Sequence, residues 1–153
     1  MAGRSTVIPL FAQLARIALA AMFLYAGFSK LLDPAAFAVS IENYRLLPCA
    51  PSGWVALYLP WLETGCAFGL FLPRLRLGAT ALLAALCAGF CGFITSALLR
   101  GLDISCGCFG GDAAARSDLR LPLLRAALLL AACAWLLMHE TRRLRRSAAA
   151  RVG

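Results

Sequence analysis

Charged side chains are scarce in this chain of 153 residues. Only 14% of its residues are Asp, Glu, Lys or Arg, against about a quarter in a typical soluble domain. This composition excludes an ordinary soluble domain. The basic excess, a formal charge of +8, lies largely at the chain ends and in one short turn. Nucleic-acid binding would need a soluble basic face, which the sequence does not provide.

Long apolar runs take the place of the missing charge. Hydrophobic residues make up 62% of the chain, and its mean hydropathy is +0.82. A bilayer-crossing helix takes roughly 20 residues, and runs of about that length cover 7–32, 54–72, 77–99 and 121–139. We therefore predict an all-α fold, a four-transmembrane-helix bundle that forms a single integral membrane domain.

The polar stretches between these runs define the loops. Outer loops are predicted over 33–53 and 100–120, and a basic tail, poorly ordered at its end, over 140–153. Asp33-Pro34 either stops the first helix or caps a short interfacial helix over 35–46. Proline and glycine between Pro48 and Gly53 predict a loop, so Cys49 is expected outside the spans.

The basic residues set the predicted orientation, because cytoplasmic loops are enriched in Lys and Arg. Four spans place both termini on one side together with the turn at 73–76, and that side has more basic residues and shorter loops. Both termini are therefore predicted to be cytoplasmic. In a bacterial inner membrane the loops at 33–53 and 100–120 then face the periplasm, where disulfides form and persist.

The second outer loop contains Cys106-Gly107-Cys108, the strongest candidate for chemistry. A disulfide across so small a loop is prone to strain, and strained, exposed disulfides exchange readily. Redox exchange, a static disulfide and metal binding are the alternatives. Tetrahedral zinc would need two further ligands, and the single histidine, His139, is predicted on the opposite side, so no metal site is predicted. Cys49 shares the outer side and could act as a resolving thiol.

Ionisable residues within or near the spans are Arg16, Lys30, Glu63 and Arg125. Such groups are costly in a bilayer and indicate a functional site by default. We expect Glu63 to pair with Arg16 or Arg125, and Lys30 to reach the interface. Glu63 would serve as a structural ion pair, in proton handling or in binding a quinone headgroup. Cysteines within the spans are small hydrophobes or a thiol relay: Cys66, Cys87, Cys91 and Cys133.

Four short motifs resemble the MauE branch of the DoxX-like membrane proteins, MauE being the methylamine-utilisation E protein. They are Tyr25–Pro34, Tyr44–Pro48, Leu59–Glu63 and Cys106–Gly110. The resemblance runs from about Arg16 to Arg125. It implies a four-helix membrane bundle that helps form or maintain disulfides in exported proteins, such as the methylamine dehydrogenase small subunit. The family motif carries over to Lys30, Glu63, Cys106 and Cys108.

The leading hypothesis is a thiol-disulfide redox or maturation factor for exported proteins, and thus a thiol-disulfide oxidoreductase. Cys106 and Cys108 would be the exchanging pair, passing electrons to quinone or to a thioredoxin-like partner. The first rival is a non-enzymatic scaffold or assembly subunit whose outer disulfide braces the loops. The second rival is a small-molecule carrier with Glu63 and Arg16 in its path. The absence of any Cys-x-x-Cys weakens the case for a self-contained quinone-linked disulfide generator.

Overall fold

The computed structural model describes residues 4–44, 49–101 and 119–152 of the chain. Within those ranges the backbone forms five α-helices and no strand. The helices are α1 (Arg4–Leu32), α2 (Pro34–Asn43), α3 (Cys49–Gly69), α4 (Arg76–Leu99) and α5 (Arg120–Val152). The predicted all-α class is confirmed.

Three of the helices are long and apolar enough to cross a membrane. They correspond to Leu10–Leu32 in α1, Arg76–Leu99 in α4 and Arg120–Arg145 in α5. α3, the second predicted span, is not among them, since Pro60, Glu63 and several aromatic residues interrupt its aliphatic run. The fourth crossing therefore stays a prediction.

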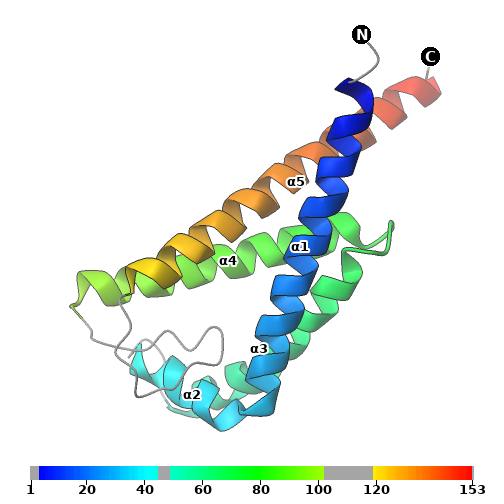
Figure 1. Ribbon diagram of the computed structural model, residues 1–153. Coiled ribbons are helices and arrows are strands. Elements are labelled where there is room, and N and C mark those ends of the chain that lie inside the picture. Colours follow the sequence, from blue (N-terminus) through cyan, green and yellow to red (C-terminus); the bar gives the residue numbers. More distant parts are fainter. Residues whose placement is uncertain (1–3, 45–48, 102–118, 153) are drawn as a thin grey trace.

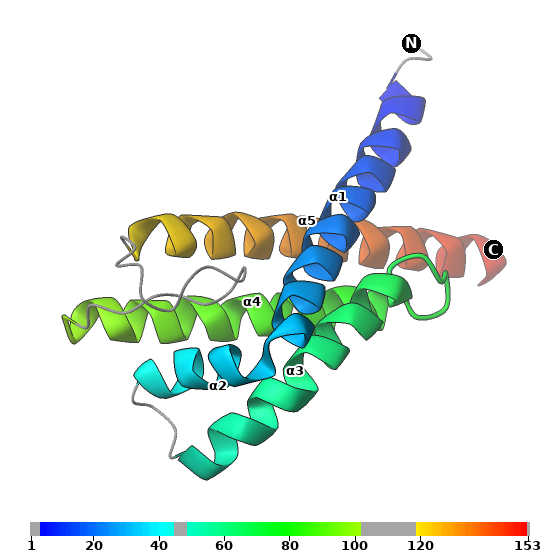
Figure 2. The same cartoon turned by 60° about the horizontal axis from the view of Figure 1, so that its bottom comes forward.

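The helices pack as two groups (Figure 1, Figure 2). α4 and α5 lie side by side and run in opposite directions, while α1 packs mainly on α3 and the short α2 also packs on α3. The start of α1, the connection from α3 to α4 and the end of α5 lie toward one end of the molecule. α2, the start of α3, the end of α4 and the start of α5 lie at the other.

Small and aliphatic side chains form the core where the two groups meet. Ala12 of α1, Ala67 of α3, Leu83 of α4, and Cys133 and Leu136 of α5 are completely or almost completely buried. Many large apolar side chains point outward instead, as expected for helices that face lipid. Examples are Leu10, Leu14, Ile17, Phe28, Trp54, Trp61, Leu82, Phe93, Leu124 and Leu128.

Two of the predicted boundaries were wrong. α3 begins at Cys49, inside the stretch predicted as a loop, and ends at Gly69. Pro51 is compatible with this early start, because backbone N–H groups in the first turn of a helix have no intrahelical acceptor, so a proline there loses no hydrogen bond. α5 continues through the predicted tail to Val152, so the basic tail is helical at its end.

The corner between α1 and α2 follows the sequence closely. The carboxylate of Asp33 accepts a hydrogen bond of 2.9 Å from the backbone N–H of Ala36, and Pro34 occupies the first helical position. This cap ends α1 at Leu32 and starts α2 directly. Phe37 of α2 and Tyr44, directly after the helix, are both buried, so this segment packs its aromatic side chains into the bundle.

Candidate functional site

A buried ion pair joins α1 to α3. The ammonium Nζ of Lys30 donates to both carboxylate oxygens of Glu63, at 2.7 Å each. Both side chains are almost completely enclosed by protein. An ion pair away from water is tolerated only when its geometry is good, and here each carboxylate oxygen has a partner.

The two helices come close together one turn before Lys30, at Gly27. A Cβ atom at that position would lie 2.6 Å from Thr64 Oγ1 and 3.2 Å from the carbonyl oxygen of Pro60. The Thr64 hydroxyl is itself held by a 2.8 Å hydrogen bond to that same carbonyl. Because glycine has no Cβ, α1 can approach α3 closely enough for Lys30 to reach Glu63.

Aromatic rings from two more helices cover the ammonium group. Lys30 Nζ lies 5.1 Å from the ring centroid of Phe37 in α2 and 5.0 Å from that of Phe90 in α4. At such distances a ring face attracts the cation. The Lys30–Glu63 pair thus contacts four of the five helices and holds α2 and α4 against α1 and α3.

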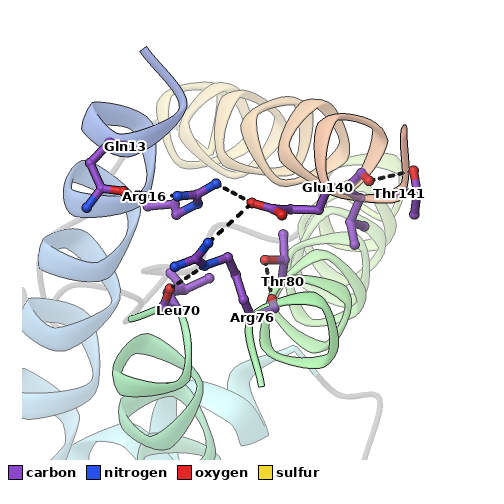
Figure 3. A network of polar contacts seen from close by, with 8 residues as sticks. Gln13, Arg16, Leu70, Arg76, Thr80, Glu140 and Thr141 are labelled. Atoms are coloured by element: carbon purple, nitrogen blue, oxygen red, sulfur yellow. Dashed lines mark hydrogen bonds and ion pairs between the residues drawn. The ribbon is translucent and has the colours of Figure 1, made fainter. Parts of the chain in front are cut away.

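A second buried network lies at the end of the bundle that contains the chain termini (Figure 3). Arg16 from α1 and Arg76 from α4 both point toward Glu140 of α5. Arg16 also donates to the Gln13 side chain at 3.0 Å, and the Arg76 Nη1 to Glu140 Oε1 distance is 3.9 Å. The Nε atom of Arg16 is buried with no hydrogen-bond partner. The network joins three helices and has more positive than negative groups.

The expected partners of Glu63 were wrong. Glu63 pairs with Lys30, and Arg16 pairs with Glu140. Lys30 also turns into the bundle instead of reaching the interface. The Arg16 side chain is buried in protein. Arg125 joins neither pair and lines an open cavity between α1 and α5.

The cysteines divide into two sets. Cys106 and Cys108 lie outside the described residues, and Cys49 is the first residue of α3. Cys66 in α3, Cys87 and Cys91 in α4, and Cys133 in α5 are free thiols. Cys87 and Cys133 both belong to the buried core of the bundle. Across the described ranges, no group of three His, Cys, Asp or Glu side chains could hold a metal.

Sequence reasoning missed Glu140, Phe37 and Phe90 as parts of these sites. A signal for Glu140 was present in the distribution of acidic residues. Five of the seven lie in the predicted outer loops and one is Glu63, which leaves Glu140 as the acid at the opposite end. Its place near the terminal end made it a candidate partner for a basic residue of the first span, such as Arg16. No comparable signal marks the two phenylalanines among the chain's nine.

Comparison with known protein families finds a match over most of the chain. The family model of the methylamine utilisation protein MauE matches residues 8–139. The MauE proteins of Paracoccus denitrificans and Methylophilus methylotrophus are 40% and 38% identical over 95 and 101 residues. These alignments cover 61% and 65% of this chain, and 51% and 53% of the relatives.

The alignment with the MauE protein of Methylorubrum extorquens is longer. It is 35% identical over 132 residues, which cover 84% of this chain and 71% of the relative. The match to the first two relatives spans only about half of their length. No solved structure matches the chain. Because the family model covers most of the residues, the chain belongs to the family of the methylamine utilisation protein MauE.

Proposed function

We propose that this membrane protein acts in methylamine utilisation, as the names of its relatives indicate, by helping exported proteins form or keep disulfides. Cys106 and Cys108 are the exchanging pair and Cys49 is the resolving thiol. A disulfide between Cys106 and Cys108 accepts attack from a client thiolate, and a mixed disulfide links the two proteins. A second client thiolate then displaces it, which leaves the client oxidised and the pair reduced.

The observation that carries this proposal is the position of the described residues on either side of the Cys106–Cys108 segment, at the same end of the bundle as Cys49. α4 ends and α5 begins toward the same end of the bundle as α2 and the start of α3, whose first residue is Cys49 (Figure 1, Figure 2). The Arg100 guanidinium, directly after α4, donates to the carbonyl of Tyr44, directly after α2, at 3.0 Å. Tyr44 also packs with Ile94, Ala97 and Leu119, so both flanks of the Cys106–Cys108 segment are anchored there.

The charge distribution supports placing this end on the periplasmic side of a bacterial inner membrane. Lys30, the basic residue at the end of α1, is neutralised by Glu63. Basic residues concentrate at the opposite end, near the termini and the α3–α4 turn, which favours a cytoplasmic position for that end. They are Arg74, Arg76, Arg142, Arg143 and Arg145.

The carrier alternative placed Glu63 and Arg16 along one path. These residues belong to two separate ion pairs, since Glu63 pairs across α1 and α3 and Arg16 across α1 and α5. This separation does not favour a shared path. The scaffold alternative stays as an outcome of the test, because a static disulfide would brace the same anchored segments.

The test replaces Cys106 and Cys108 by serine in a strain that depends on this protein for growth on methylamine. We expect normal protein level in the membrane, loss of disulfide formation in the periplasmic client and loss of growth. Cys91→Ser, a partly buried thiol within α4, is the matched control and should behave as the wild type. Loss of the protein itself together with client maturation would favour the scaffold. In a variant with both Cys108→Ser and Cys49→Ser, the remaining Cys106 thiolate should attack the disulfide of an oxidised client and release one client thiolate, and the resulting mixed disulfide should be visible on non-reducing gels.

A further inference from the structure

A ring contact and an ion pair join α1 to α5 toward the end of the bundle that holds the chain termini. Phe11 packs edge-to-face on Trp135 with ring centroids 5.2 Å apart, and the Arg16–Glu140 ion pair lies one to two turns further along α1. α1 then runs on along α3, whereas α5 follows α4 (Figure 1). The two helices therefore separate toward the end of the bundle where α4 ends and α5 begins.

A cavity of about 570 Å³ lies where the two helices have separated. Its lining includes Ala21, Met22 and Tyr25 of α1 and Arg125 of α5, about three helical turns from the Phe11–Trp135 contact. Tyr25 is 64% exposed and Arg125 is also exposed, so the cavity opens to the side of the bundle. Since Arg125 lies within the candidate span Arg120–Arg145, that side faces lipid.

The lining combines two apolar side chains with two polar ones. Ala21 and Met22 are apolar, while Arg125 offers a fixed fork of N–H donors and Tyr25 a phenolic hydroxyl. A cavity of a few hundred cubic ångströms, mostly apolar with a few placed donors, is typical of small-molecule sites. Arginine within a span is costly and indicates a function by default.

We propose that this cavity binds the headgroup of a membrane quinone, with Arg125 and Tyr25 donating hydrogen bonds to its ring oxygens. A quinone reaches a side-facing cavity through the bilayer and leaves its isoprenoid tail in lipid. This inference rests on the proposed function, because thiol oxidation needs an electron acceptor near the outer cysteines. Arg125 lies little more than one turn into α5, about 7.5 Å along the axis from Arg120 at its start.

The cavity fits a quinone better than an anionic phospholipid. Among the described residues its lining has one cation, Arg125, placed inside the candidate span. The basic residues suited to phosphate headgroups gather at the other end of the bundle, at Arg142, Arg143 and Arg145. A neutral ring with two acceptor oxygens needs only a few donors and an apolar contact.

The redox step balances without a further reactant. The two thiols of Cys106 and Cys108 lose two protons and two electrons as their S–H bonds break and an S–S bond forms. The quinone takes up those two electrons, and its two carbonyl oxygens gain two protons to give the hydroquinone. The pair is then ready to oxidise the next client.

The test measures binding of decylubiquinone to the full-length protein in lipid nanodiscs by quenching of tryptophan fluorescence. We expect saturable binding whose Kd rises about tenfold or more in Arg125→Gln, since a hydrogen bond from a charged donor is lost. Ala21→Leu should weaken binding similarly by filling the cavity without changing charge. Arg120→Gln, an exposed neighbour outside the lining, should leave the Kd unchanged.

Other outcomes overturn the inference. Wild-type protein that shows no saturable quenching, or Arg125→Gln and Ala21→Leu variants that bind as tightly as the wild type, exclude a quinone site here. Arg125-dependent retention of phosphatidylglycerol without quinone binding assigns the cavity to a phospholipid instead.

Failure of the proposed function can be distinguished from failure of the quinone site, because quinone binding is measured without client oxidation. If quinone binds here but Cys106→Ser and Cys108→Ser leave client maturation intact, the proposed function fails and the site stands. If maturation needs both cysteines and quinone does not bind, only this inference fails.

Discussion

The two buried charge networks differ in enclosure and in balance. In the Lys30–Glu63 pair the side chains are 2% and 1% exposed, and one cation meets one anion with both carboxylate oxygens engaged. In the network of Arg16, Glu140 and Arg76 the side chains are 6%, 11% and 19% exposed. Two cations there share one anion, and a guanidinium nitrogen of Arg16 lacks a partner.

This difference predicts that the two networks tolerate the loss of a charged side chain to different degrees. A closed, neutral pair has no substitute for a missing partner, so losing one side leaves an uncompensated charge in the interior. A network near the end of the bundle can recruit water or lipid headgroups, and Arg76 offers a second cation to Glu140. We therefore expect α1 and α3 to depend more on Lys30–Glu63 than α1 and α5 depend on Arg16–Glu140.

The largest effect is expected from Glu63→Gln, which leaves the Lys30 ammonium buried without its anion. The free energy of unfolding should fall by about 3–5 kcal/mol. It can be measured by circular dichroism during SDS titration in mixed micelles. The double variant Lys30→Met with Glu63→Leu should recover much of the loss, since no charge remains. Glu42→Gln is the control, because the Glu42 carboxylate is only half-buried and accepts a hydrogen bond from Ser52. Equal losses of stability in the two variants would contradict a special dependence on the Lys30–Glu63 pair.

The second largest effect is expected from Glu140→Gln, which leaves Arg16 and Arg76 facing each other without their shared anion. A loss of about 2–3 kcal/mol is expected in the same titration. Arg16→Met should cost less, because Arg76 remains 3.9 Å from the carboxylate. Arg142→Gln, an exposed neighbour on α5, serves as the control. A greater loss in Arg16→Met than in Glu140→Gln would show that Arg76 does not share the anion.

A smaller loss is expected from Gly27→Ala, which would push α3 away from α1 beside Lys30. An added methyl would meet Thr64 Oγ1 at 2.6 Å, and overpacking of this kind costs about 1–3 kcal/mol. Gly65→Ala on α3 is the matched control, since its Cβ would meet nothing within 4 Å. That control should be neutral or slightly stabilising, because alanine favours helix over glycine. Thermal unfolding in detergent would separate the two variants.

The smallest effect is expected from Asp33→Ala, which removes the cap of α2 and loosens the helix that places Phe37 over Lys30. The expected cost is about 1 kcal/mol. Asp33→Asn should retain most of the stability, because asparagine also caps helices well. Hydrogen exchange of the α2 backbone amides is the direct measurement. Unchanged exchange in Asp33→Ala would mean that packing alone holds α2.

Much of the helical framework could be predicted from local sequence. The apolar runs give α1, α4 and most of α5, and Asp33-Pro34 marks the corner before α2. The start of α3 at Cys49 could not be found in this way, because a proline-rich stretch is equally compatible with a loop and with a first helical turn. The helical tail of α5 was also missed, since its charged composition fits a disordered segment as well as a solvated helix.

For the candidate sites, the sequence by itself determined which residues are costly in a membrane. Arg16, Lys30 and Glu63 stand out because few charges interrupt the apolar runs. Only the tertiary structure decided how they pair. The partner of a buried charge depends on the depth and crossing of helices that are distant in the chain, and Gly27 permits the close approach that brings Lys30 to Glu63. The separation of α1 from α5, which leaves Arg125 beside a side-facing cavity, is likewise set by packing between helices and not by any local motif.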